Sequence, residues 1–273
     1  MKNLCRVFGN PISQSKSPLI HSLFAKQFDL DLRYDKCTDG LESFEDAVAA
    51  FFTKAGAIGA NVTLPFKQRA YDYADELSPH ALRSGAVNTL YKRKGIVYGD
   101  NTDGRGLVWD LKRHNIDING LHVLLIGAGG AAQGCIPALF DAGIEKLDIS
   151  NRTVEKAQQM IDQLKTNSDW NLSLFNETQK YDLIINATSL SLSRKVPEIK
   201  DEILSSAKVC YDMVYLDEPT AFMQYANRVG VEKTIDGIGM LVGQAAESFR
   251  VWFDLSPDLN TVVQALKTKG NHS

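Results

Sequence analysis

The chain has 273 residues, of which 44% are apolar and 23% charged, and its formal net charge is −3. These values are typical of a globular protein with one or two domains, and they give no reason to expect a nucleic acid or an anionic membrane as partner. Because no apolar run reaches a membrane span and the N-terminus lacks a secretory apolar core, we expect a cytoplasmic protein.

Neither the cysteines nor the five histidines show metal-ligand spacing. The four cysteines are scattered and form no C-x-x-C pair: Cys5, Cys37, Cys135 and Cys210. We interpret them as small core residues in a reducing compartment, and we predict no metal site.

The first hundred residues alternate between strand and helix patterns. Strands are expected at 4–8, 34–37 and 58–62, and helices at 19–28 and 43–55. The second of these helices has apolar residues at helical spacing, among them Val48 and Phe51. A hairpin is expected at 87–91 and 96–98, followed by a helix at 106–114. This alternation predicts an α/β unit.

The alternation of strand and helix patterns restarts at Leu121. Strands are expected at 123–126, 146–150, 183–186 and 209–211, with helices between them. A last helix, 240–253, carries one apolar stripe that we expect to pack on the first domain: Leu241, Ala245, Phe249 and Trp252. The sequence therefore predicts two α/β domains, and the cleft between such domains is a natural small-molecule site.

The stretch from Gly127 to Ala132 reads GAGGAA and follows a strand that is apolar without interruption. It fits the pattern G-x-G-x-x-A, in which Gly127 allows a tight turn, Gly129 lets a pyrophosphate approach and Ala132 packs closely. A helix that begins here directs its N–H groups at bound phosphates. Pro137 is expected to kink or shorten this helix.

The next strand ends in Asn151-Arg152-Thr153, where an NAD-binding site would carry an acid. Asp148 comes too early for that role, because it lies inside the strand. Arg152 and Lys156 flank the first turn of the following helix, a position that suits the 2′-phosphate of NADP. Ordinary helix-surface charge is the alternative interpretation.

Several polar residues of the first domain have both a structural and a functional interpretation. Pro65 suits a first helical position, which puts Lys67 in a first turn where the dipole disfavours a cation. Lys67 is either a solvated lysine or a proton-transfer group, and Asp103 is either a helix cap or its partner. Asn88 is a polar insertion in an apolar strand. Ser15 and Ser17 are either loop residues and a helix cap, or a pair of hydroxyls that binds a carboxylate.

The chain resembles the shikimate dehydrogenase family of bacterial aromatic biosynthesis. The matching stretches occur in the family's order from residue 8 to about residue 246: GNPISQSKSP, GANVTLPFK, GAVNTL, GDNTDGRG, GAGGAA, NRT, INATS, YDMVY and DGIGMLVGQAA. The combination of S-x-S-P, N-V-T-x-P-F-K and N-T-D-G is specific to this family among Rossmann proteins.

The resemblance implies an α/β fold with an N-terminal substrate domain (1–103, completed by 241–273) and an NADP-binding Rossmann domain (104–240). It implies a catalytic pair, Lys67 and Asp103. It implies further substrate-binding residues. Ser15 and Ser17 would bind the substrate carboxylate, and Tyr215 would face the substrate. Four more residues would bind its hydroxyls: Asn61, Thr63, Asn88 and Gln244. It implies these cofactor-binding residues: Gly127, Ala128, Gly129, Gly130, Ala131, Asn151, Arg152, Thr153, Lys156, Thr188, Met213, Gly237 and Met240.

The implied function is the reversible NADPH-dependent reduction of 3-dehydroshikimate to shikimate by an oxidoreductase without a metal, acting as a monomer or homodimer. The pathway would lead to chorismate and the aromatic amino acids. Two departures stand out: the motif N-R-T-x-x-R ends here in Lys156, and the loop 190–194 lacks the family's usual glycine. The alternatives are an NAD-dependent quinate/shikimate dehydrogenase and a non-catalytic NADP-binding regulator. Arg152 argues against the first, and the presence of both Lys67 and Asp103 argues against the second.

Overall fold

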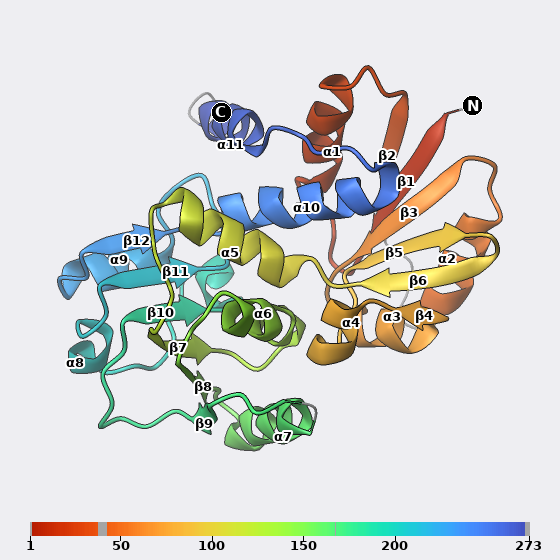
Figure 1. The fold of residues 1–273 in the computed structure, drawn as a ribbon. Helices are drawn as coiled ribbons and strands as arrows, with labels where there is room; N and C mark the ends of the chain where they lie inside the picture. The colour runs from red at the N-terminus through yellow and green to blue at the C-terminus, as the bar shows by residue number, and fades with distance from the viewer. Residues whose placement is uncertain (1, 38–42, 167, 271–273) are drawn as a thin grey trace. The chain divides into compact units, whose positions relative to one another are not determined.

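The computed structural model describes residues 2–37, 43–166 and 168–270 (Figure 1). The chain is α/β and divides into two compact units, each built on a six-stranded sheet. Unit 1 ends at Gly106 and includes Leu241–Thr268, while unit 2 comprises Leu107–Met240 and the end of the last helix from Lys269. The expected domain ranges also include 1, 38–42, 167 and 271–273, which lie outside the described residues.

The sheet of unit 1 has the strand order β2-β1-β3-β5-β6-β4. Its parallel half pairs β1 with β2 and β3, and β5 is antiparallel to both β3 and β6. The strands are β1 (Asn3–Phe8), β2 (Leu32–Cys37), β3 (Ala57–Val62), β4 (Glu76–Leu77), β5 (Thr89–Arg93) and β6 (Ile96–Asp100). The carboxyl ends of β1 and β3 therefore lie together at one edge.

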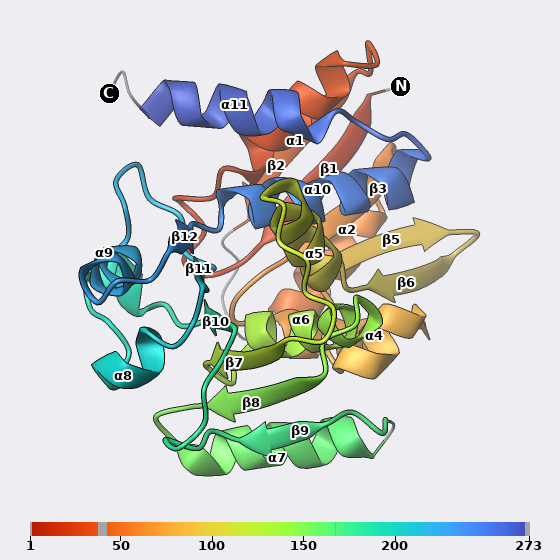
Figure 2. The same cartoon turned by 60° about the vertical axis from the view of Figure 1, so that its left-hand side comes forward.

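The helices of unit 1 pack against both faces of this sheet. They are α1 (Ser17–Lys26), α2 (Phe44–Phe52), α3 (Lys67–Tyr73), α4 (Pro79–Ser84), most of α10 (Ile238–Phe253) and α11 (Leu259–Gly270). In both views α1 and α10 lie on one side of the sheet and α2 on the other (Figures 1 and 2). Phe51 of α2 packs edge-on against Phe8, and Phe249 of α10 packs against Phe24. The predicted stripe of α10 thus packs within unit 1.

The sheet of unit 2 is parallel throughout, with the order β12-β11-β10-β7-β8-β9. Its strands are β7 (His122–Ile126), β8 (Lys146–Ser150), β9 (Leu172–Leu174), β10 (Leu183–Asn186), β11 (Val209–Asp212) and β12 (Lys233–Ile235). The strand order reverses between β7 and β10, as in the Rossmann fold. Dinucleotides bind at the carboxyl ends of the strands at such a point.

Both faces of this sheet are covered, which explains the uninterrupted apolar run in β7. Val123 and Leu125 join a core with one set of helices, and Leu124 and Ile126 join a core on the opposite face. The helices are α5 (Asp103–Arg113), α6 (Gly130–Asp141), α7 (Val154–Lys165), α8 (Asp201–Leu204) and α9 (Ala221–Arg228), with a 3₁₀ turn at Leu190–Ser193. The first turn of α5 belongs to unit 1.

Three local predictions were wrong, at least in part. Pro65 is not the first residue of a helix, because Thr63 to Phe66 form a turn in which the Phe66 N–H donates to the Thr63 carbonyl. α3 begins at Lys67, which therefore lies in a first turn as predicted. Of the two effects expected of Pro137, the shortening of α6 does not occur: the helix continues to Asp141, and Pro137 is one of its buried residues. β5 begins at Thr89, so Asn88 directly precedes the strand, and its side chain accepts the Thr102 N–H.

Three of the cysteines, Cys5, Cys135 and Cys210, are buried thiols, and Cys37 accepts a weak hydrogen bond from Arg6. Among the described residues, no helix is both long enough and apolar enough to cross a membrane. No group of three or more potential metal-ligating side chains occurs in this part of the chain either.

Candidate active site

Lys67 and Asp103, which are 36 positions apart in the sequence, form an ion pair in unit 1. Lys67 is the first residue of α3 and Asp103 the first residue of α5, so two helix starts hold the two charges together. The Lys67 Nζ contacts Asp103 Oδ2, and the side chains are 11% and 8% exposed. The pair is therefore largely shielded from bulk water but remains accessible to a ligand.

Asn88 holds the other oxygen of this carboxylate. The Thr102 N–H donates to Asn88 Oδ1 over 2.9 Å, which fixes the orientation of the amide because a backbone N–H can only donate. Asn88 Nδ2 then donates to Asp103 Oδ1 over 2.7 Å, and Gln244 Oε1 lies 3.4 Å from the same nitrogen. Asp103 is thus held on one oxygen by an ammonium and on the other by an amide.

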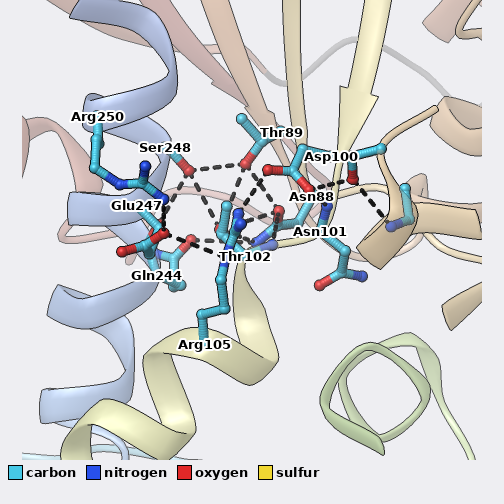
Figure 3. A network of polar contacts seen from close by, with 12 residues as sticks. Asn88, Thr89, Asp100, Asn101, Thr102, Arg105, Gln244, Glu247, Ser248 and Arg250 are labelled. Carbon is cyan, nitrogen blue, oxygen red and sulfur yellow. Dashed lines mark hydrogen bonds and ion pairs between the residues drawn. The ribbon is translucent and has the colours of Figure 1, made fainter. Parts of the chain in front are cut away.

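A wider polar network surrounds this core and joins α10 to the ends of β5 and β6 (Figure 3). Arg105, in the first turn of α5, bridges Asp100 at 2.6 Å and Glu247 at 3.3 Å. The Ser248 hydroxyl lies 2.8 Å from the hydroxyl of Thr89. These contacts fix the side of α10 that carries Gln244 against the helix start that carries Asp103.

The other predicted substrate residues of unit 1 lie in the loops after β1 and β3 or, in the case of Asn61, in β3 itself. Ser17 is the first residue of α1, and its N–H donates to Ser15 Oγ at 3.3 Å, so the Ser15 hydroxyl hydrogen remains available to a ligand. The Thr63 N–H donates to the Phe8 carbonyl over 2.9 Å. Asn61 is only 6% exposed. Adjacent parallel strands thus bring the two loops to one edge of the sheet.

In unit 2, the glycine-rich turn follows β7 at the point where the strand order reverses. Gly127 has φ +116°, and a Cβ there would lie 3.3 Å from the carbonyl carbon of Ala187 after β10. A Cβ on Gly129 would meet open space, so the backbone there is accessible. α6 begins at Gly130 with no acid in its first turn, and Ala131 follows in the same turn. These features fit a pyrophosphate at the helix N-terminus.

The turn after β8 fits the adenosine end of NADP. Asn151 Oδ1 accepts the Ala128 N–H at 3.2 Å, which ties this turn to the glycine-rich turn. Arg152, Thr153 and Lys156 are exposed, and neither cation forms an ion pair with a described residue. Thr153 is the N-cap of α7, but its side chain makes no capping hydrogen bond.

Asp148 cannot supply the ribose-binding acid of an NAD site. It is fully buried in β8, where Lys146, His122 and Tyr181 contact its carboxylate. The hydroxyl of Tyr181 donates to Asp148 Oδ2 at 2.9 Å, and the pKa of this phenol is raised mainly by burial. The exposed charged residues after β8 are two cations, Arg152 and Lys156, and one acid, Glu155, in the first turn of α7.

The remaining predicted cofactor residues lie after β10, after β11 and at the start of α10. The Thr188 hydroxyl donates to Asn186 Oδ1 over 2.7 Å, and the Met213 N–H donates to the Asn186 carbonyl over 2.9 Å. A Cβ on Gly237 would clash with the Met213 carbonyl oxygen at 2.1 Å, so only glycine fits there. Met240 is buried in the core of unit 2.

The loop 190–194, which lacks the family's usual glycine, contains a regular turn. Residues Leu190–Ser193 form the 3₁₀ turn, which ends at Arg194 with φ +56°. The Ser191 hydroxyl donates to Asp212 Oδ2 at 2.6 Å, and Asp212 also accepts from Asn186. Burial raises the pKa of Asp212, although these hydrogen bonds oppose the shift. Tyr215 is half-buried in unit 2, whereas the other predicted substrate residues lie in unit 1.

One unit has a Rossmann sheet with an accessible glycine-rich turn, and the other holds a lysine–aspartate pair. These two features together are typical of a dinucleotide-binding oxidoreductase. Three family profiles match the chain: the shikimate dehydrogenase substrate binding domain at residues 7–90, shikimate/quinate 5-dehydrogenase at 110–210 and the shikimate 5′-dehydrogenase C-terminal domain at 237–267. The chain belongs to the shikimate dehydrogenase family.

Similar proteins agree with this assignment. Shikimate dehydrogenase (NADP⁺) of Pseudoalteromonas atlantica is 49% identical over 96% of this chain and 97% of its own length. The crystal structure of an Ael1 enzyme from Pseudomonas putida has a TM-score of 0.88 and 35% identity, covering 97% of this chain and 98% of that one. The Thermus thermophilus shikimate 5-dehydrogenase in complex with NADP(H) and shikimate has a TM-score of 0.86 and 29% identity, covering 98% and 99%.

Sequence reasoning missed several residues that hold the site together. Thr102 fixes the amide of Asn88, and Thr89 with Ser248 completes the surrounding hydrogen bonds. Two signals could have identified them: Thr102 directly precedes Asp103, and Ser248 lies one helical turn after Gln244. Nothing local in the sequence indicates that Asp212 binds Ser191.

Proposed function

We propose that this chain catalyses the reversible NADP-dependent interconversion of shikimate and 3-dehydroshikimate, in the pathway to chorismate and the aromatic amino acids. The observation that carries the proposal is the shielded Lys67–Asp103 pair, with Asn88 on the second carboxylate oxygen and Gln244 beside it. Family membership and the NADP⁺ enzymes among the relatives support it.

In the proposed reaction, Lys67 donates a proton to the alkoxide oxygen that develops on the reduced ketone, and in the opposite direction it accepts the proton of the hydroxyl. Asp103 keeps the ammonium in place and orients the reacting hydroxyl. Asn61, Thr63, Asn88 and Gln244 bind the ring hydroxyls, and Tyr215 faces the substrate. When bound, NADP(H) accepts or supplies the hydride.

The carboxylate of the substrate is assigned to Ser15 and Ser17. Two hydroxyls next to the start of α1 can donate to both carboxylate oxygens, in a place where the helix dipole favours an anion. We assign the 2′-phosphate of NADP to Arg152 and Lys156, and the pyrophosphate to the turn from Gly127 to Ala131. Thr188, Met213, Gly237 and Met240 are assigned to the rest of the cofactor site.

The alternatives fit less well. An NAD-dependent quinate/shikimate dehydrogenase would need a ribose-binding acid, but Asp148 is buried and already bound. A regulator that only binds NADP would have no use for a shielded lysine–aspartate pair. We further propose a cytoplasmic enzyme, monomeric or homodimeric, with no nucleic acid or membrane partner. Its buried thiols suit a reducing compartment.

The direct test is to mix the purified chain with shikimate and NADP⁺ and to follow the formation of NADPH by absorbance. NADPH should form only when both reactants are present. If none forms with shikimate while a different polyol or hydroxy acid is oxidised, the proposed substrate is wrong.

A further inference from the structure

Tyr34 of β2 is outside every motif of the site, yet its phenol contacts one of the proposed substrate residues. Its hydroxyl donates to Asn61 Oδ1 at 2.8 Å. Its ring stacks on His21 of α1, with ring centres 4.4 Å apart and planes 9° from parallel. The phenol is therefore held in position by its ring as well as by its hydrogen bond.

The hydrogen-bond partners of Asn61 determine which end of its amide faces Tyr34. Ser248 donates its only hydroxyl hydrogen to the Gln244 carbonyl at 3.0 Å, so its oxygen accepts from Asn61 Nδ2 at 2.9 Å. The carbonyl oxygen of Asn88, which can only accept, lies 3.3 Å from the same Nδ2. Because Nδ2 faces these acceptors, Oδ1 faces Tyr34 and the phenol is the donor.

The Tyr34 phenol remains protonated and can therefore donate to Asn61. Burial is the main reason why the pKa of Tyr34 is well above its usual value, and the neighbouring Cys5 raises it further.

We propose that Tyr34 is a positioning residue of the substrate site, which fixes Asn61 as a hydrogen-bond acceptor for the substrate. Both amide hydrogens of Asn61 face Ser248, Thr89 and the Asn88 carbonyl. The remaining bonding capacity of this side chain is the second lone pair of Oδ1, so a substrate hydroxyl can only donate to it. This inference rests on the proposed function.

Tyr34→Phe tests the proposal, because it keeps the stacked ring and removes only the hydroxyl. The dissociation constant for shikimate, measured by titration calorimetry, should rise about fivefold to tenfold, as expected for one lost hydrogen bond. The dissociation constant for NADP should not change. Tyr98→Phe is the matched control: this ring stacks on Tyr91 in the same unit, its hydroxyl has no bond to a described residue, and affinity should stay at the parent value.

A double-mutant cycle with Asn61→Ala separates positioning from general structural support. If Tyr34 acts through Asn61, Tyr34→Phe should cost no further affinity in the Asn61→Ala background. If Asn61→Ala does not fold, shikimate analogues that each lack one ring hydroxyl replace it: one of them should bind Tyr34→Phe and the parent equally well. Additive losses, a penalty that persists with every analogue, or unchanged affinity in Tyr34→Phe would overturn the proposal. A parent chain that does not turn over shikimate would instead refute the proposed function.

Discussion

Replacing Lys67 with alanine removes the proposed proton-transfer group and leaves the rest of the site in place. Loss of a general acid–base group should lower turnover of shikimate by about 100-fold or more, which is about 2.7 kcal/mol of transition-state stabilisation. Shikimate affinity should change little, because the serines and the amide side chains remain. Steady-state kinetics in both directions, with calorimetric binding of shikimate, measure the two effects separately.

The same change should also lower the free energy of unfolding. The Asp103 carboxylate is 8% exposed and would keep only Asn88 of the two side chains that now hold its oxygens, at a cost of about 1–3 kcal/mol. Assays must therefore be run well below the melting temperature of the variant. Gln68→Ala is the matched control, since it is the next residue of α3 and, among the described residues, its exposed side chain bonds only Asp72. Turnover close to the parent value in folded Lys67→Ala would refute the catalytic role.

Three further predictions follow from other parts of the molecule. Arg152→Ala should weaken NADP binding far more than NAD binding, because only NADP carries the 2′-phosphate; equal losses in calorimetric titrations would contradict the assignment. Ser15→Ala/Ser17→Ala should raise the KM for shikimate but not for its methyl ester, and equal losses for acid and ester would show that the serines do not bind the carboxylate. Burial lowers the pKa of His21 from 6.5 to about 3, so the unfolded chain binds more protons in that window and stability falls as the pH falls through it. Between pH 6.5 and 5 this loss is about 2 kcal/mol, and urea unfolding of His21→Phe should show a flatter pH profile than the parent; parallel profiles would refute the reasoning.

The fold was predictable wherever a pattern was long and local. The strand at residues 146–150 and the strand at 183–186 have the predicted bounds, because polar residues bound their Leu and Ile residues at both ends. The short strands β4, β9 and β12 were missed, since two or three residues are too few to show a hydrophobic periodicity. Pro137 shows the limit of a local rule, because packing of α6 outweighs one lost backbone hydrogen bond.

For the site, motifs indicated which residues to examine, but not how they are held. The sequence left Lys67 and Asp103 with two interpretations each, and only the fold brings them together across 36 positions. The orientation of Asn88 depends on the backbone of Thr102, which no side-chain pattern reports. Tyr34 and Asp212 bind through contacts between separate strands and loops, so a single sequence contains no signal for them.

The measurement that tests the central claim most directly is kcat/KM for shikimate and for quinate, each with NADP and with NAD. Shikimate with NADP should be the best of the four combinations, because exposed Arg152 and Lys156 stand where an NAD enzyme needs an acid. A value for quinate with NAD that equals or exceeds the value for shikimate with NADP would contradict both the proposed substrate and the proposed cofactor site.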